Sequence, residues 1–532
     1  MPRHDEGEAG ADQLSRRRFL RVAATGVAAI GAGGVLAACG SSSGSTPTAH
    51  TAAKAKPKRG GTLAAGFTGG SSSDTLSAEF PVNNLDWARN AQLYEPLVRY
   101  GADAQYEFVL AEEITPNADA TVWTVRLRSG VTFHNGKSLT ADDLIYTLQT
   151  IFNKKTPAPE SYPLGAMDVA GLKKLDSRTV QIPYKSPFST FKDPLCYGVY
   201  LIPVGYDPTN PVGTGPFRYK TFTAGVESTF VRNDSYWQFG LPYVDEVVIT
   251  NYPDETTQLN ALAAGQVNLV NLLSSTAISQ VAAAGAKTVI SPGGGFTPFT
   301  MRTDVAPFND VRVRQAFRYI IDRPQMRELV FGGHGTLGND IFSIWDPLYD
   351  HSIPQREQDI AHAKFLLKQA GQENLTVELV TAPVAEGTVL AAQVLAQQAK
   401  AAGVTVNLRQ TTVTEFYGSQ YLKWTFAQDY WYYDRYLLQV GSTFLPTSLY
   451  NETHFNDPKY TALYNEGVST LDRAKQRSVI AEMQQIDYDS GGYIIPYFPP
   501  IIDGYSSKVN GVIPSKVGAS FNQYDFKNLW LS

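Results

Sequence analysis

One short segment of this 532-residue chain combines side chains that could bind a small molecule. Residues 429–436 read DYWYYDRY, five aromatic rings with the acid Asp434 and the base Arg435 among them. In the wall of a ligand cavity, rings supply contact area and one charge fixes the ligand's orientation. In a protein core, the same rings bury apolar area while the two charges pair with each other. Both interpretations stay open from this segment alone.

Patterns that often mark catalysis or metal binding have little support. GHGTLG at 333–338 matches a dinucleotide fingerprint, but it follows a predicted helix instead of a strand and opens no helix. GSSSG at 40–44 matches a nucleophile elbow, yet lies in a Ser/Gly-rich linker. The histidines are scattered, with no C-x-x-C and no H-E-x-x-H. We therefore expect no catalytic constellation, no metal site and no cofactor.

Three other motifs have ordinary structural explanations. GTGPF at 213–217 could cradle a phosphate, but without a following Lys-Ser/Thr a tight turn is favoured. Arg312 and Arg314 could bind an anion, although a solvated helix flank with ion pairs is the better expectation. His134 in HNG is expected to belong to its turn.

Composition describes an ordered globular protein with more than one core. Hydrophobic residues make up 43% of the chain, aromatic residues 12% and charged residues 18%. Single cores stop growing at roughly 250–300 residues, so two or three lobes are expected. The net charge is -5 and no long basic run follows Arg59, so nucleic acid is not an expected partner.

The N-terminus predicts export and membrane attachment. SRRRFLR at 15–21 precedes an Ala/Gly-rich apolar run that ends in LAAC, with Cys39 last. This resembles a twin-arginine signal, carried by Arg16 and Arg17, joined to a lipobox. It predicts a signal peptide over 1–38, and a lipidated cysteine with a flexible tether over 39–58. Only Cys196 then remains, which excludes an intrachain disulfide in the folded part.

The folded part alternates strand and helix signals. TVWTVRLRSG at 121–130 predicts a strand, and Thr140 with Asp143 predicts a capping box that opens a helix. Residues 309–333 predict two helices, the second capped by Asp322. NLTVELVTA, GTVLAAQVLAQQAKAAG and VTVNLRQT predict a parallel strand pair with a crossover helix. The predicted fold class is α/β in several lobes.

These segments resemble a known family. WTVRLRSGVTFHNGKSLTADDLIYTL, NPVGTGPF, NDSYWQFGLPYVDEVVI, LAAGQVN and PFNDVRVRQAFRYIIDR occur in the order found in family 5 of the bacterial extracellular solute-binding proteins. That family comprises oligopeptide, dipeptide and nickel receptors of ABC importers. The resemblance covers nearly everything from Gly60 to the C-terminus.

The resemblance implies a periplasmic-binding-protein-like fold of three lobes, with a ligand cleft between lobes I and III. Two crossing strands would join those lobes, near GGGFTPF at 293–299 and GGYIIPYFPP at 491–500. The predicted boundaries are 59–83, 203–297 and 490–532 for lobe I, 84–202 for lobe II, and 298–489 for lobe III.

The resemblance also implies capture and delivery of a solute. The first expectation is a short peptide, passed to the ABC permease and ATPase subunits by a monomeric receptor outside the cytoplasmic membrane. Alternatives are a nickel or cobalt chelate, haem, a small sugar or a polyamine. A secreted hydrolase or a purely structural lipoprotein would belong to a different class, and no motif here supplies a nucleophile and base.

Candidate ligand contacts follow partly from the family. In its peptide-binding branch, a Trp is followed three positions later by an Asp that meets the ligand's α-ammonium, a spacing that Trp431 and Asp434 reproduce. Arg435 departs from that branch, and its charge could neutralise Asp434 and turn the site toward an anionic ligand. Further candidate contacts are Phe67, Thr68, Phe299, Trp345 and Tyr433.

Overall fold

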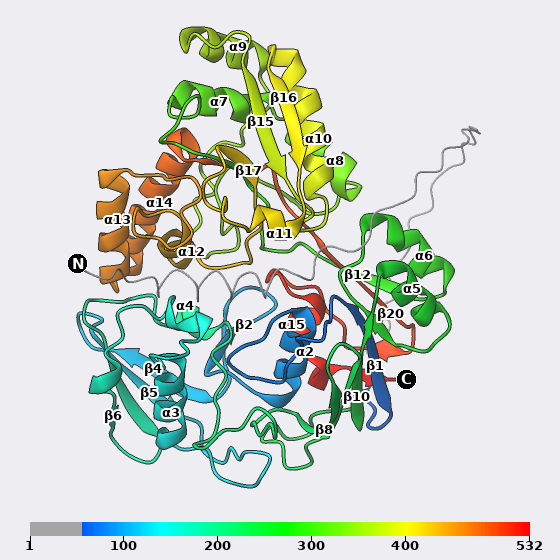
Figure 1. The fold of residues 1–532 in the computed structure, drawn as a ribbon. Helices are drawn as coiled ribbons and strands as arrows, with labels where there is room; N and C mark the ends of the chain where they lie inside the picture. The colour runs from blue at the N-terminus through cyan, green and yellow to red at the C-terminus, as the bar shows by residue number, and fades with distance from the viewer. Residues whose placement is uncertain (1–55) are drawn as a thin grey trace, which may run out of the picture.

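The computed structural model describes residues 56–532. Three larger sheets organise this part of the chain, and each forms a body with the helices packed on it (Figure 1). The body around the five-stranded sheet lies at the top of Figure 1, and the other two lie side by side below it. We name them the seven-stranded, four-stranded and five-stranded bodies.

The seven-stranded body is built from segments far apart in the sequence. Its strand order is β12-β20-β11-β1-β10-β9-β8, with β1 parallel to β10 and β11. The strands are β1 (Thr62–Thr68), β8 (Phe217–Thr223), β9 (Glu227–Arg232), β10 (Glu246–Tyr252), β11 (Leu269–Val270), β12 (Lys287–Ser291) and β20 (Ile501–Tyr505), with helices α2 (Asn84–Leu93), α5 (Glu255–Ala263) and α6 (Ile278–Ala283).

Helix α2 differs from the predicted lobe division. Its residues Leu85, Ala88 and Leu93 are buried in one core with β1 and β10, whereas the sequence placed residue 84 onward in lobe II. A helix belongs with the sheet that buries its apolar face. Residues 84–93 therefore pack with the seven-stranded body, and the remaining lobe boundaries stay predictions.

The four-stranded body has the antiparallel order β4-β5-β7-β6. In β5, alternate residues Trp123, Val125 and Leu127 are buried, as the strand pattern predicts. The predicted capping box is present, because the Asp143 carboxylate accepts from the Thr140 backbone N–H at 2.9 Å. The elements are β2 (Val98–Tyr100), β3 (Tyr106–Phe108), β4 (Ala111–Pro116), β5 (Val122–Leu127), α3 (Ala141–Ile151), β6 (Lys173–Lys174), β7 (Thr179–Pro183) and α4 (Lys192–Leu195).

The five-stranded body has the order β16-β15-β17-β13-β18. The predicted strand–helix–strand unit is confirmed, with β15 parallel to β16 across α10. Asp322 caps α8, and Gly332 ends it with φ of 58°, a left-handed conformation that favours glycine. The strands are β13 (Phe299–Met301), β15 (Thr376–Thr381), β16 (Thr405–Gln410), β17 (Phe426–Gln428) and β18 (Tyr493–Ile494); the helices are α7 (Val311–Ile320), α8 (Arg323–Phe331), α9 (Ile360–Gln369), α10 (Thr388–Ala399), α11 (Val413–Phe416), α12 (Tyr436–Thr443), α13 (Pro458–Ser469) and α14 (Arg473–Ser490).

Two chain segments cross between the seven-stranded and five-stranded sheets. The first runs from β12 to β13, and the second from β18 to β20, where the sequence placed them. The second also contributes β19 (Tyr497–Phe498), which pairs with β14 (Thr336–Leu337). After β20, the chain forms β21 (Val509–Asn510), α15 (Ser520–Tyr524), which is a left-handed turn, and β22 (Trp530–Leu531).

The four-stranded and five-stranded bodies touch each other directly. The backbone N–H of Ser189 donates to the carbonyl of Val468 at 2.7 Å, and the Gln476 side chain donates to the Ser189 hydroxyl at 3.2 Å. The backbone N–H of Leu449 donates to the Tyr162 hydroxyl at 2.8 Å. These hydrogen bonds hold the four-stranded and five-stranded bodies against each other.

Candidate functional site

Residues 429–435 alternate between buried and partly exposed side chains, and Tyr436, which opens α12, is buried. Asp429, Trp431, Tyr433 and Arg435 are buried, whereas Tyr430, Tyr432 and Asp434 keep accessible surface. Successive side chains of an extended chain point to opposite sides, so residues of one parity share a face. The core interpretation therefore holds for one face of the segment, and the ligand-cavity interpretation stays a prediction for the other.

The buried face is core. The indole N–H of Trp431 donates to the Glu452 carboxylate at 2.9 Å. Tyr433 is fully buried, and its ring meets that of Tyr100 edge to face at 5.3 Å. Trp431 and Tyr433, both predicted to contact ligand, therefore pack inside the protein in this conformation.

Asp434 lies on the accessible face and has no counter-charge. Its carboxylate makes no hydrogen bond or ion pair within residues 56–532, although Asp193 and Tyr197 of the four-stranded body lie near it. Burial raises the pKa of Asp434 well above its usual range, and the charge of Asp193 raises this pKa further. A carboxylate kept from water without a partner is unfavourable, so the site favours a cation that supplies the missing charge.

Four tyrosines gather near Asp434, and sequence reasoning did not single them out. The rings of Tyr430 and Tyr432 meet edge to face at 4.9 Å. Tyr197 comes from the four-stranded body, and burial followed by the Asp434 charge raises its pKa. Tyr524 comes from the left-handed turn, and burial followed by the proximity of Tyr432 raises its pKa. Parity with Asp434 predicts Tyr430 and Tyr432, whereas Tyr197 and Tyr524 lie far away in sequence.

Arg435 pairs with an acid of another body instead of Asp434. Its Nε lies 3.5 Å from Oδ1 of Asp193, on α4, and both side chains are buried. The guanidinium also stands over the Tyr106 ring, 4.0 Å from the centroid. The prediction that Arg435 neutralises Asp434 is therefore wrong in this structure, because Asp193 takes the guanidinium.

A family model identifies the chain. The model of the bacterial extracellular solute-binding proteins, family 5, matches residues 105–460, well over half of the sequence. The chain belongs to this family.

Individual relatives extend this assignment over most of the chain. Heme-binding protein A of Haemophilus influenzae is 26% identical, over 91% of this chain and 95% of its own length. Oligopeptide-binding protein AppA of Bacillus subtilis is 26% identical, over 63% of this chain and 64% of its own length. The crystal structure of the ABC transporter substrate-binding protein CtaP of Listeria monocytogenes covers 89% of this chain and all of its own, with a TM-score of 0.80 at 21% identity. That structure supports the predicted periplasmic-binding-protein fold.

Of the other predicted ligand contacts of this solute-binding protein, two lie in the core and one contacts a crossing segment. Phe67 is fully buried and stacks on Phe521 at 6.3 Å, and Phe299 is fully buried beside Phe426. Neither presents surface to a ligand in this conformation. The indole of Trp345 donates to the carbonyl of Gly293 in the first crossing segment. Thr68, the half-buried last residue of β1, stays a prediction.

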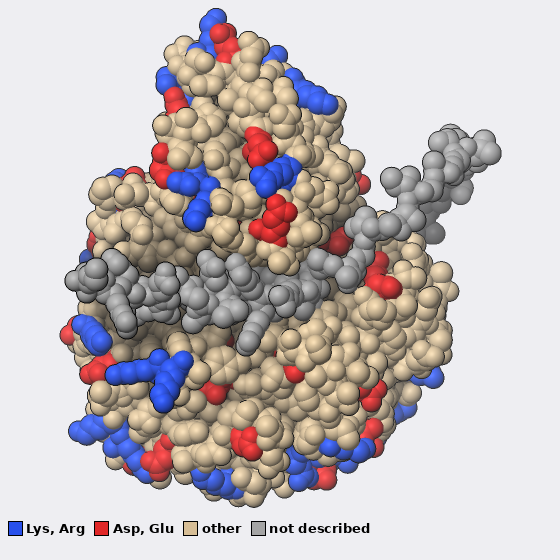
Figure 2. All heavy atoms as spheres, in the orientation of Figure 1, with Lys and Arg blue, Asp and Glu red and all other residues tan. Residues whose placement is uncertain are grey.

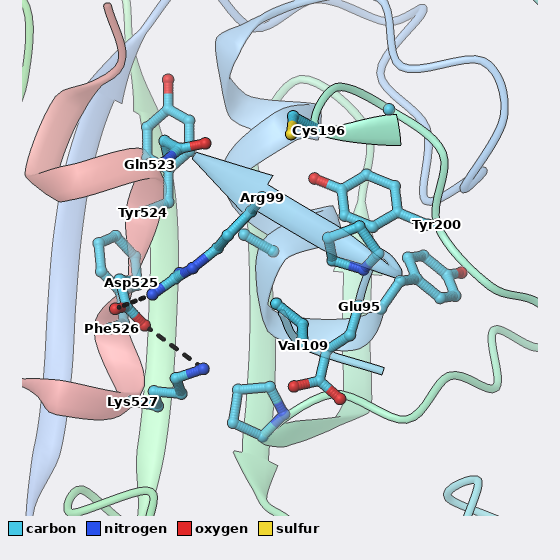
Figure 3. Close-up of a pocket in the computed structure, with 15 residues that line it drawn as sticks. Glu95, Arg99, Val109, Cys196, Tyr200, Gln523, Tyr524, Asp525, Phe526 and Lys527 are labelled. Carbon is cyan, nitrogen blue, oxygen red and sulfur yellow. Dashed lines mark hydrogen bonds and ion pairs between the residues drawn. The ribbon is translucent and has the colours of Figure 1, made fainter. Parts of the chain in front are cut away.

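A cavity lies between the four-stranded and seven-stranded bodies (Figure 3). It is about 70 Å³ in volume, and its charged groups already have partners. Arg99 pairs with Asp525 at 3.0 Å, and Glu95 accepts from Trp237 at 2.8 Å and from Tyr236. The cavity is too small for a peptide, and its charges are satisfied internally.

The remaining motifs have structural roles. The His134 ring contacts Gly213 and Gly215 of GTGPF, and a Cβ at either glycine would clash with the end of α2. The two arginines of α7 differ from each other. Arg312 pairs with Asp310 at 2.6 Å on the surface, as predicted. Arg314 is buried instead, and its guanidinium donates to the backbone carbonyls of Phe308, Ser490 and Gly491. A solvated flank was the wrong prediction for Arg314, because the α7 face that carries it packs against the end of α14.

Several sequence predictions concern the surface or fall outside the described residues. Cys39, Arg16 and Arg17 lie outside 56–532, so their roles stay predictions.

Within 56–532, no helix combines the length and apolar character that a membrane crossing requires, and no group of His, Cys, Asp and Glu is arranged to hold a metal. On the face in Figure 2, acidic and basic side chains are interspersed, without an extended surface of one sign.

Proposed function

We propose that this solute-binding protein captures a short peptide by its α-ammonium and delivers it to the permease and ATPase subunits of an ABC importer. The observation that carries the proposal is Asp434, a carboxylate enclosed by two bodies and without a counter-charge. An ammonium at Asp434 would restore the ionised form of the acid in a water-poor site, where such contacts are strong.

The aromatic surroundings suit a peptide. Tyr430, Tyr432, Tyr197 and Tyr524 offer rings for side-chain contact and hydroxyls for hydrogen bonds to peptide groups. Because these residues come from three bodies, a ligand touching all of them would favour the docked arrangement over an open one.

Haem is the second candidate, because the relative matched over 95% of its own length is named a heme-binding protein. Haem carries carboxylates, and an uncompensated acid such as Asp434 repels them. The geometry therefore favours the peptide.

Thermal-shift measurements on the mature protein test the choice of ligand. Pools of dipeptides to pentapeptides, the same pools N-acetylated, haem and nickel–histidine are added separately. A ligand that binds the folded state raises the unfolding midpoint with increasing concentration. We expect this rise with the free peptides and a smaller one with the acetylated pool. A rise with haem alone would overturn the peptide proposal.

We also propose that the protein does not alter its ligand. The family is one of binding proteins, and no nucleophile–base pair emerged from the sequence. Mass spectrometry after incubation with the peptide pools should return every peptide intact. Any turnover would replace the receptor proposal with an enzymatic one.

Export by the twin-arginine route and attachment through a lipidated Cys39 complete the proposal. Acyl chains contribute about 0.8 kcal/mol per buried methylene, enough for stable anchoring when several chains are present. Cys39→Ala should release a monomeric protein into the soluble fraction, and Arg16→Lys with Arg17→Lys should abolish export. Membrane retention of the first variant, or export of the second, would contradict these assignments.

A further inference from the structure

We propose that Asp193 is a specificity-determining positioning residue: by taking Arg435 when the bodies dock, it leaves Asp434 free for a cationic ligand. The inference rests on the proposed function, because it assumes that Asp434 meets the ligand's ammonium. Its starting point is the adjacency of two opposite charges, Asp434 and Arg435, only one of which has a partner.

Hydrogen bonds within the four-stranded body orient the Asp193 carboxylate toward the Arg435 guanidinium. The residue lies on α4, is 4% exposed, and accepts from the hydroxyl of Tyr100 at 3.1 Å and from that of Tyr106. These two bonds fix the carboxylate in the wall of the four-stranded body, where Oδ1 faces Nε of Arg435 at 3.5 Å. The neighbouring cation Lys192 lies over the same Tyr106 ring, with its Nζ 5.0 Å from the centroid, but forms no ion pair with Asp193 within residues 56–532.

Within residues 56–532, the hydrogen bond, the ion pair and the ring contacts of the Arg435 side chain are all with the four-stranded body, and the charge of Asp346 acts on it from its own body. The guanidinium stacks over Tyr106 at 4.0 Å, lies 5.6 Å from the centroid of Tyr100, and donates from Nη2 to the carbonyl of Ala104 at 3.3 Å. Arg435 itself belongs to the five-stranded body. A planar guanidinium suits such a stacked and hydrogen-bonded position better than an ammonium does.

The consequence is a link between docking and ligand choice. When the two bodies separate, Asp193 moves away and Arg435 is free to turn to its neighbour Asp434, which would cancel the charge that a ligand ammonium needs. When they dock, Asp193 withdraws the guanidinium and Asp434 is left bare. Asp193 would thus act on the ligand through Arg435, without touching the ligand.

Double substitution separates this role from simple packing. We expect Asp193→Asn to weaken retention of free-amine tripeptides to pentapeptides by at least about tenfold, because Arg435 then neutralises Asp434. Arg435→Gln loses the pair that joins the bodies but should keep the wild-type preference for the free-amine pool over the N-acetylated pool, and the double variant Asp193→Asn with Arg435→Gln should regain that preference. Native mass spectrometry with the free and N-acetylated pools measures each variant, and Asp142→Asn, an exposed acid of the same body, is the control.

Three outcomes would overturn the inference: unchanged binding in Asp193→Asn, no recovery of the free-amine preference in the double variant, or loss of that preference in Arg435→Gln. If the wild type retains neither pool, the peptide proposal itself fails. Docking is then tested alone by X-ray scattering of the ligand-free proteins. Asp193→Asn and Arg435→Gln should each show a larger radius of gyration than the wild type, and equal radii would contradict the interbody pair.

Discussion

Two enclosed carboxylates in the five-stranded body have opposite surroundings. Asp340 accepts two bonds of 2.7 Å from Arg323, and its Oδ2 lies 3.2 Å from Arg356 and 3.9 Å from Arg318. Burial acts to raise the pKa of Asp340, but the three guanidiniums together hold it below its usual value. Asp434 has no such partner, and burial raises its pKa.

The difference distinguishes structural acids from acids reserved for a ligand. Asp340 also accepts from the backbone N–H of Ile495 in the second crossing segment. Asp340 and its three arginines therefore connect the helices to that segment. An enclosed acid that the protein leaves without a counter-charge costs stability, and such a cost persists where it serves binding. The following experiments separate the two cases, beginning with the largest expected effect.

Asp340→Asn should destabilise the protein most. The substitution leaves three buried guanidiniums without their shared counter-charge, and breaking a buried pair in this way costs about 3–5 kcal/mol. Denaturant unfolding measures the loss. Asp304→Asn, which breaks an exposed pair with Arg302, is the control and should cost about 0–1 kcal/mol. A loss no larger than the control's would mean that the cluster is not structural.

Asp434→Asn should show the converse pattern. Removing this uncompensated acid should leave the unfolding midpoint of the ligand-free protein unchanged or slightly higher, while affinity for a free-amine peptide falls by about two to three orders of magnitude. Calorimetry on wild type and variant measures both quantities. A large loss of ligand-free stability with unchanged affinity would place Asp434 in the same class as Asp340.

His134 extends the comparison to a buried base that stays neutral. Burial lowers its pKa from 6.5 to about 4. Between these values the unfolded chain binds a proton that the folded protein does not, so stability is full above pH 6.5 and falls as the pH drops toward 4. Allowing for partial exposure, we expect His134 to account for about 1–2 kcal/mol of this loss. Unfolding midpoints of wild type and His134→Gln across that range test it, since the variant should lack this component; parallel profiles would refute the assignment.

Tyrosine hydroxyls should give the smallest effects. Tyr197→Phe removes one polar group near Asp434, and the loss of one hydrogen bond weakens peptide binding by about 0.5–1.5 kcal/mol. Tyr433→Phe is the matched control, because its buried hydroxyl has no hydrogen-bond partner and its ring lies on the opposite face. Calorimetry decides between them, and a greater loss for Tyr433→Phe would contradict the assignment of faces.

Local elements were largely predictable because their signals are local. Asp322 and Gly332 bound α8, Thr140 and Asp143 form the capping box, and β15 and β16 pair in parallel across α10. Caps and turns depend on residues a few positions apart, and the crossover rule depends only on element order. The three-body architecture followed from the family resemblance, which the comparisons bear out.

The site was predictable only in part. Asp434 was predicted to meet the ligand and stays a prediction on the accessible face, but Trp431 and Tyr433 were assigned to the ligand although they face the core. In an extended segment, odd-numbered and even-numbered residues face opposite sides. The residue numbers alone therefore indicated that Trp431 and Tyr433 lie on the face opposite Asp434. Trp345 was predicted as a ligand contact, yet its indole is bonded to a crossing segment, which no pattern in the sequence indicated.

Local sequence signals predicted several of the strands and helices, and they placed an acid and a base side by side in an aromatic segment. Which of these two charges has a partner depended on how the bodies pack. Arg435 meets Asp193, more than two hundred residues earlier, and from other bodies Tyr197 comes near Asp434 and Tyr524 comes near Tyr432. Electrostatic partners are chosen by distance and desolvation after packing, and neither is encoded in residues adjacent along the chain.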